Sequence, residues 1–411
     1  MIGRIIFSLL FIAFYFGIEY YAFNGLKILF KSGMPRAVKW SYWILVAFPI
    51  LWLFIGRGLF EIDLRWLNNA VIGIFISLIV AKLFFILFLA LEDIYRILRF
   101  GTESVMAIGN EEKHANFESR RRFVAQIGIA VASIPFLSFL YGVTRGKYAY
   151  TVHNIQVAYK DLPEAFDGLR ILQISDIHSG SFDSMAAVER GVEMIQAQKA
   201  DIILFTGDLV NSHAHEIEPY VDIFKSLSAP LGKFSVLGNH DYGHYPDGDE
   251  RAVENMKALQ GHHATMGFRL LNNENQFLEK NGEKIRLVGV ENWGKSKHFP
   301  KEGDLDKAFE GVDPEEFCIL MSHDPSHWEA KILDFPKKVQ LTLSGHTHGM
   351  QLGVEIPGMK WSPSKYLYPQ WAGLYEREDQ KIYVNRGFGF LGFPGRVGIL
   401  PEITVLELKK A

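Results

Sequence analysis

The stretch that decides the fold is LRILQISDIH, residues 169–178, in which an apolar run of strand length ends in Asp176 and His178. Four later runs of the same kind end in TGD (206–208), GNHD (238–241), SHD (322–324) and GHTHG (345–349). Between the first two runs, residues 185–198 have the apolar spacing of an amphipathic helix. Strands that alternate with helices predict a layered α/β or α+β domain.

The polar residues at the strand ends predict a metal site. Ligand sites in open α/β sheets lie outside the carboxyl ends of the strands, so we expect the five loops to meet. Asp176 and His178 are separated by one residue, as are His346 and His348, so each pair can lean toward one point. Carboxylate, imidazole and amide ligands without thiolate suit manganese, iron or zinc. The candidate ligands outnumber those of a four-coordinate site, which predicts two divalent metal ions bridged by one carboxylate.

The amino-terminal third of the chain has a different character. The chain has 411 residues, a formal net charge of -3 and 22% charged residues, a balance that argues against a nucleic-acid-binding protein. Its single cysteine, Cys318, excludes an intrachain disulfide and a cysteine-based zinc site. Four apolar stretches have the length of membrane spans, namely 5–23, 40–56, 69–91 and 123–142. We therefore predict a membrane domain at 1–143, a linker at 144–150 and a catalytic domain at 151–411.

The charges near the spans predict an orientation. Lysine and arginine are more frequent in loops 24–39 and 92–122 than on the other side, which places the large domain outside the cytoplasm. The sequence SRRRFV at 119–124 resembles a twin-arginine export signal. We expect a multi-pass protein of the bacterial inner membrane with an extracytoplasmic catalytic domain. Glu19 and Lys82 lie inside spans and can pair there, but the simpler interpretation, in which Lys82 extends to the interface and Glu19 lies at it, is favoured.

The order of the five motifs resembles the calcineurin-like metallophosphoesterase superfamily, and GHTHGMQ (345–351) with NRGFG (385–389), Arg396 and PE (401–402) is similar to its membrane-associated bacterial branch. The resemblance implies a four-layer αββα sandwich over residues 150–408, preceded here by four transmembrane α-helices. It also implies one metal held by Asp176, His178 and His348, another held by Asn239, His323 and His346, and Asp208 as the bridge. His240 would be the catalytic imidazole, oriented by Asp241. The second motif continues as GDLVN, without the acidic residue or arginine of many relatives, which puts only contacts around the ligands in doubt.

These features predict a membrane-anchored, metal-dependent phosphoesterase that hydrolyses a phosphodiester, a monoester or a pyrophosphate of lipid or cell-envelope origin. Its expected partners are this phosphoester substrate, lipid-linked in one version of the prediction, and the lipid bilayer. One alternative is a cytoplasm-facing pyrophosphatase that cleaves a nucleotide-linked lipid precursor of the lipid A type. A second is an inactive metal-binding scaffold or sensor, against which the complete set of ligands argues.

Several other residues leave two interpretations open. Arg386 and Arg396 either contact a substrate phosphate or form structural salt bridges. Core packing explains most of the aromatic residues near the later loops, while one or two are candidates to grip an acyl chain or lie at the bilayer surface. These aromatic residues are Trp293, Trp361, Tyr366, Tyr368 and Trp371.

Overall fold

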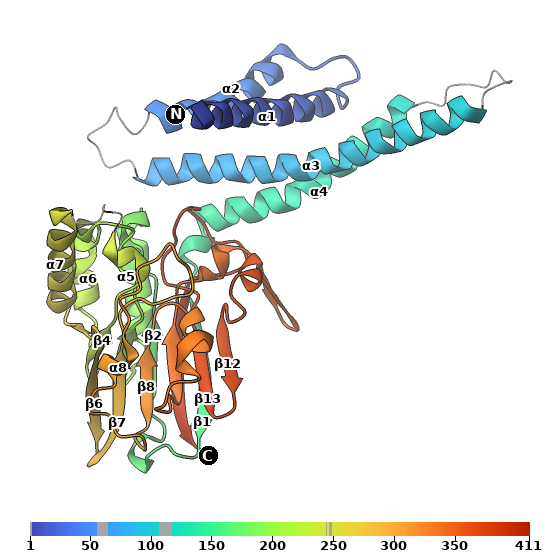
Figure 1. Ribbon diagram of the computed structural model, residues 1–411. Helices are drawn as coiled ribbons and strands as arrows, with labels where there is room; N and C mark the ends of the chain where they lie inside the picture. Colours follow the sequence, from blue (N-terminus) through green and yellow to red (C-terminus); the bar gives the residue numbers. More distant parts are fainter. Residues whose placement is uncertain (1, 56–64, 107–116, 244, 246–248) are drawn as a thin grey trace. The chain divides into compact units, whose positions relative to one another are not determined.

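The protein is described by a computed structural model that covers residues 2–55, 65–106, 117–243, 245 and 249–411 (Figure 1). Its contacts divide the chain into two compact units, residues 1–143 and 144–411. The described residues of the first unit form four helices, α1 (Ile2–Lys27), α2 (Arg36–Ile55), α3 (Arg65–Met106) and α4 (Phe117–Thr144). The predicted linker at 144–150 packs as part of the second unit, because Lys147 and Tyr148 both bond to the carboxylate of Asp183.

The helices of the first unit contain the four predicted spans, except for residue 56, which lies outside the described residues. Among the described residues, two stretches are long and apolar enough to cross a membrane, 65–100 and 119–144, with mean hydropathies of 2.8 and 2.0. Helix α3 continues well past the predicted end of its span, and α4 already includes Arg120, Arg121 and Arg122. The basic segment before the fourth span is therefore helical.

The expectation for Glu19 and Lys82 was wrong. The Nζ atom of Lys82 lies 2.7 and 2.8 Å from the two carboxylate oxygens of Glu19, and the hydroxyl of Tyr42 donates a third hydrogen bond at 2.7 Å. The Glu19 side chain is fully buried and that of Lys82 is 15% exposed. Helices α1 and α3 bring the two groups to the same depth, where pairing avoids the cost of separate charges in hydrocarbon.

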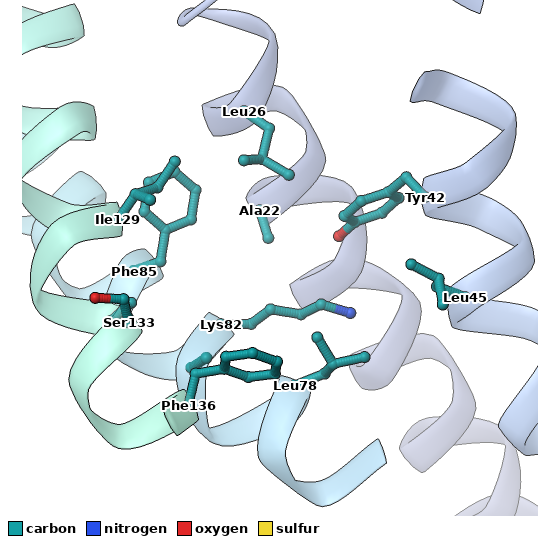
Figure 2. Close-up of a pocket in the computed structure, with 12 residues that line it drawn as sticks. Ala22, Leu26, Tyr42, Leu45, Leu78, Lys82, Phe85, Ile129, Ser133 and Phe136 are labelled. Atoms are coloured by element: carbon teal, nitrogen blue, oxygen red, sulfur yellow. The ribbon is translucent and has the colours of Figure 1, made fainter. Parts of the chain in front are cut away.

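A largely apolar cavity of about 330 Å³ lies beside this ion pair (Figure 2). Figure 2 shows Lys82 extending from α3 toward α2, next to the ring of Tyr42. The cavity is lined by Ala22, Leu26, Tyr42, Leu45, Leu78, Ala81, Lys82, Phe85, Ile129, Ala132, Ser133 and Phe136. The charges of Glu19 and Lys82 therefore neutralise each other beside an apolar cavity.

The second unit contains two six-stranded sheets. The first has the order β1 (Thr151–Tyr159), β14 (Glu402–Lys410), β2 (Arg170–Ile174), β3 (Ile202–Phe205), β4 (Lys233–Ser235) and β5 (Arg269–Leu270). The second has the order β12 (Gly373–Arg377), β13 (Gln380–Val384), β9 (Leu341–Ser344), β8 (Cys318–Met321), β7 (Glu283–Gly289) and β6 (Glu274–Lys280). A separate hairpin is formed by β10 (Val354–Ile356) and β11 (Met359–Trp361). The central strands β2, β3, β8 and β9 are parallel to a neighbour and buried, as expected for strands covered on both faces.

The cores confirm the predicted four-layer αββα sandwich. Ile171 and Leu204 of the first sheet share one cluster with Leu287 and Ile319 of the second, so the sheets pack face to face. The outer face of the first sheet is covered by α5 (Met185–Gln196), α6 (Val221–Lys225) and α7 (Glu250–Thr265). The outer face of the second is covered by α8 (Leu305–Ala308) and the π-helix Trp328–Ile332.

Candidate metal centre

The five predicted loops lie together at the carboxyl ends of β2, β3, β4, β8 and β9. They supply Asp176 and His178, Asp208, Asn239 and His240, His323, and His346 and His348, in that order. All seven predicted metal ligands are buried except His346, whose side chain is still only 8% exposed. Parallel strands bring their carboxyl ends to one edge of each sheet, and the two sheets present these edges side by side.

The first group of ligands consists of Asp176, His178 and His348. The Nε2 atoms of His178 and His348 are 3.0 Å apart, and Nε2 of His348 lies 3.2 Å from Oδ1 of Asp176. The backbone N–H of His346 donates to the Asp176 carboxylate at 3.0 Å, which fixes its orientation.

The second group consists of Asp208, His323 and His346, with Asn239 beside them. Nε2 of His323 lies 3.1 Å from Oδ2 of Asp208 and 3.2 Å from Nδ1 of His346. Nδ1 of His346 is 2.7 Å from Oδ1 of Asn239. The same Oδ2 atom of Asp208 lies 3.5 Å from Nε2 of His178 in the first group, so one carboxylate oxygen faces both groups.

The ring hydrogen bonds orient these atoms so that they could hold cations. The Nδ1 atom of His323 donates to the carbonyl of Thr206 at 2.7 Å, which leaves its Nε2 facing Asp208, where it can carry a proton or bind a metal. Nε2 of His346 is 2.8 Å from the hydroxyl of Tyr368, which leaves its Nδ1 to face Asn239. Two acceptor atoms at separations of 2.7–3.5 Å repel one another unless a proton or a metal cation lies between them. These separations also equal the edges of a coordination shell with bonds of about 2.1 Å.

The electrostatics of the site favour positive charge. The carboxylates of Asp176 and Asp208 are completely buried, and neighbouring imidazoles keep the pKa of each below its usual value although burial alone would raise it. Burial would lower the pKa of His323, but the carboxylates of Asp208 and Asp176 raise it to about 10. Without a metal the site therefore binds a proton, and a cation would take its place.

The backbone around the ligands is strained. Asp176, His178, Asp208, His346 and His348 all have φ between 47° and 70°, the left-handed region that side chains rarely adopt. Such strain persists only where the surrounding structure enforces it, and it concentrates at functional sites. At Gly345 the restriction is steric, since a Cβ atom would collide with Ser175 Oγ and the Asp176 carboxylate.

His240 lies next to the ligands but belongs to neither group. Its ring packs against that of His178 at a centroid distance of 5.0 Å, and its Nδ1 lies 2.8 Å from the carbonyl oxygen of Asn211. The role expected of Asp241 needs correction, because its carboxylate accepts the backbone N–H groups of Asp208, Leu209 and Gly238 at 2.8–2.9 Å. Asp241 thus holds the loop of Asp208, and the carbonyl of Asn211 orients His240. Burial, followed by the charge of Asp208, raises the pKa of Asp241 to about 7.

Sequence reasoning missed the groups that hold the ligands in place. The carbonyls of Thr206 and Asn211 carry no signature of their own, because every residue has a carbonyl. Tyr368 is one of the aromatic residues near the later loops, but nothing in the sequence indicates that its hydroxyl lies beside His346.

Arg386 and Arg396 have structural partners. The guanidinium of Arg386 forms ion pairs with Glu355 and Glu402. Arg396 donates to the carbonyls of Gly387 and Gly389 and lies 3.1 Å from Nδ1 of His348. The salt-bridge interpretation is correct for Arg386, and both residues fix the carboxyl-terminal loop beside the first ligand group.

Comparisons with known proteins match both units. The sequence model described as calcineurin-like phosphoesterase matches residues 169–350, and the model described as probable calcineurin-like phosphoesterase, transmembrane domain, matches residues 3–147. The uncharacterized metallophosphoesterase YkuE of Bacillus subtilis is 31% identical over 300 residues, which are 71% of this chain and 98% of that protein. The zebrafish (Danio rerio) transmembrane protein with metallophosphoesterase domain is 29% identical over 73% of this chain, which spans 65% of that protein. An uncharacterized metallophosphoesterase of Helicobacter pylori is 28% identical over 72% of this chain and 73% of that protein.

Proposed function

Since the chain belongs to the calcineurin-like metallophosphoesterase family, we propose that it hydrolyses a phosphoester at a dinuclear metal centre. The centre would be formed by Asp176, His178 and His348 on one side and by Asn239, His323 and His346 on the other. The observation that carries this proposal is the position of Asp208 Oδ2, which lies 3.5 Å from His178 Nε2 and 3.1 Å from His323 Nε2. One oxygen that faces both groups is the geometry of a bridging ligand.

The metal ions, Asp241 and His240 would each have a distinct role in the reaction. When bound, two divalent ions lower the pKa of a coordinated water and offset the charge that develops on the phosphoryl group. Asp241 keeps Asp208 in place through the backbone of its loop. The Asn211 carbonyl accepts the Nδ1 proton of His240, so Nε2 is the nitrogen that would stabilise the phosphoryl oxygens or protonate the departing oxygen.

The types of metal ligand and the membrane unit indicate which metals and which substrates the protein would use. Imidazole and carboxylate ligands suit manganese, iron or zinc. The family match to a transmembrane domain supports a substrate found at a membrane, such as a phosphodiester, monoester or pyrophosphate of a lipid or cell-envelope component. We place the protein in a bacterial inner membrane with its catalytic unit outside the cytoplasm, on the distribution of basic residues.

A topology reporter tests the placement. A fusion of a periplasm-dependent phosphatase after Ala411 should be active in intact cells. If only a reporter that functions in the cytoplasm is active after Ala411, the alternative of a cytoplasm-facing pyrophosphatase is favoured.

Hydrolysis by the full chain in detergent tests the activity. We expect bis(p-nitrophenyl) phosphate or p-nitrophenyl phosphate to be cleaved after addition of manganese, iron or zinc, and a chelator should abolish the activity reversibly. His262→Ala, which removes an imidazole on α7 outside both ligand groups, serves as the control and should retain the activity. Inactivity of a folded preparation with every metal would contradict the proposal.

A further inference from the structure

The segment from Met350 to Leu367 leaves the metal centre and returns to it. It begins two residues after His348 and ends just before Tyr368, whose hydroxyl lies 2.8 Å from Nε2 of His346. The hydroxyl of Ser362 donates to the carbonyl of Gly349 at 2.6 Å and closes the base of the segment beside the ligands. The β10–β11 hairpin projects from this base, with its turn at Pro357 and Gly358.

The hairpin carries its apolar side chains on the face turned away from the body of the catalytic unit. Val354 pairs with Trp361 and Ile356 pairs with Met359, so these four side chains share one face. Glu355 and Lys360 pair on the opposite face. That polar face is bound to the body of the unit, because Glu355 forms an ion pair with the buried Arg386 and Lys360 donates to the carbonyl of Ala372.

The apolar face is exposed to an unusual degree. Val354 is 37% exposed, Ile356 58% and Met359 51%, while Tyr366 and Leu367 at the end of the segment reach 72% and 68%. In the described part of residues 144–411, ten large apolar side chains are exposed, and six of them lie in this segment. Concentration of this kind marks a contact surface, whereas single exposed apolar residues are ordinary.

We propose that the apolar face of this segment inserts into the bilayer surface and presents the phosphoester headgroup of a membrane lipid to the metal centre. The proposal rests on the proposed phosphoesterase function. It defines the substrate as a lipid phosphoester taken directly from the membrane, and the contact surface as Met350, Val354, Ile356, Met359, Tyr366 and Leu367.

Two observations favour a bilayer over a protein as the occupant. Six residues separate the end of α4 at Thr144 from the start of β1 at Thr151, and such a link reaches at most about 25 Å. The catalytic unit therefore remains near the membrane in which α4 is embedded, whatever its orientation. The composition is also that of a membrane interface, with aliphatic side chains at the hairpin tip and the partly buried Trp361 and the exposed Lys365 and Tyr366 near its base.

Two reporters with the same reacting group test the substrate class. The full chain would be assayed with bis(p-nitrophenyl) phosphate in solution and with p-nitrophenyl hexadecyl phosphate in phosphatidylcholine vesicles. We expect Ile356→Ser with Met359→Ser to lower hydrolysis of the vesicle-bound ester about tenfold, because two apolar side chains no longer enter the bilayer. Hydrolysis of the soluble ester should stay within about twofold, which also shows that the variant is folded.

A matched control separates the possible outcomes. Val253→Ser removes an apolar side chain that is 72% exposed on α7, away from this segment, and should change neither rate. Equal effects of the hairpin and control variants on the vesicle-bound ester would overturn the lipid-contact proposal. If the unaltered protein cleaved neither the soluble nor the vesicle-bound ester, this would instead contradict the proposed function.

A fluorescent probe tests the contact without reference to activity. Met359→Cys and Val253→Cys would each be labelled with bimane, since Cys318 is buried and stays unlabelled. In nanodiscs that contain doxyl-labelled phosphatidylcholine, we expect the probe at 359 to be quenched and the probe at 253 to remain bright. Equal quenching at both positions would overturn the proposal. It would also be overturned if, in detergent without lipid, a second copy or another protein already shielded the probe at 359 from solvent.

Discussion

Each of the two units contains a buried carboxylate, and the groups that surround the two carboxylates differ in charge. In the membrane unit, the carboxylate of Glu19 receives the ammonium group of Lys82 and the hydroxyl of Tyr42 at 2.7–2.8 Å. In the catalytic unit, Oδ2 of Asp208 faces the ring nitrogens of His178 and His323. The imidazole nitrogens of His178 and His348 also face each other, at 3.0 Å.

This difference in surrounding charge distinguishes a structural cluster around Glu19 from a candidate binding site around Asp208. The Glu19 cluster contains as much positive as negative charge, so it is complete without a ligand. The Asp208 cluster is rich in acceptors, which stabilise one another only around cations. Removal of a residue should therefore affect stability in the membrane unit, and metal content or turnover in the catalytic unit.

Loss of the shared carboxylate should have the largest effect. Asp208→Ala removes a ligand from both groups, and we expect it to lose bound metal and to lower turnover by about four orders of magnitude or more. Elemental analysis and a p-nitrophenyl ester assay measure the two effects. Asp306→Ala, which removes an exposed carboxylate on α8, is the control and should change neither. An Asp208→Ala protein with full metal content and activity would show that Asp208 is not a shared metal ligand.

His240 should separate metal binding from chemistry. Because its side chain lies outside both ligand groups, His240→Ala should retain both metals while kcat falls about 10²–10⁴-fold, the usual contribution of a positioned proton donor. Metal content and kcat measured on the same preparation decide the point. Loss of metal along with activity would show that His240 is a ligand.

Lys82 should affect stability alone. Lys82→Met leaves the buried Glu19 carboxylate without its cation, and we expect the free energy of unfolding in detergent to fall by about 3–5 kcal/mol. The double variant Glu19→Gln, Lys82→Met removes both charges and should recover most of that loss. Thermal unfolding measures the change, while metal content per folded chain should remain the same. An equally stable single variant would show that the pair is dispensable.

Tyr368 should have the smallest effect. Tyr368→Phe removes the hydroxyl that bonds to Nε2 of His346 but leaves every predicted ligand in place. We expect about a tenfold loss of metal affinity or kcat, as is usual for a partner that orients a ligand. Titration of the metal-free protein with manganese measures the affinity. A loss as large as that of Asp208→Ala would mean that Tyr368 contacts the reacting groups directly.

Much of the candidate metal centre could be predicted from the sequence, because the predicted ligands come in short motifs directly after strands and the structure brings them together. The i, i+2 pairs at 176–178 and 346–348 and the asparagine-histidine-aspartate run at 239–241 specify both ligand type and position. The contact of Asp241 was not readable, because adjacency to His240 says nothing about where its carboxylate points. It faces the backbone of the Asp208 loop, a contact across 33 positions of the chain.

The fold was readable where strands are apolar and buried. β2, β3, β8 and β9 lie within the predicted runs, whereas β1 was missed, because its parallel pairing with β14 joins the two ends of the catalytic unit. The polar edge strand β6 was also missed, although Asn281 and Gly282, with φ of 50° and 83°, form the turn that such a dipeptide signals between paired strands. In the membrane unit, sequence showed that Glu19 and Lys82 share a depth but could not show that α1 and α3 turn them toward each other.

Electron paramagnetic resonance can show whether two metal ions share Asp208. The full chain, freed of metal and given two equivalents of manganese(II), should show the spectrum of an exchange-coupled pair, which requires a common ligand. We expect Asp208→Ala to abolish the coupled signal, because it removes the carboxylate that would bridge the two ions. A spectrum of two magnetically independent ions in the unaltered protein, or of unbound manganese alone, would contradict it.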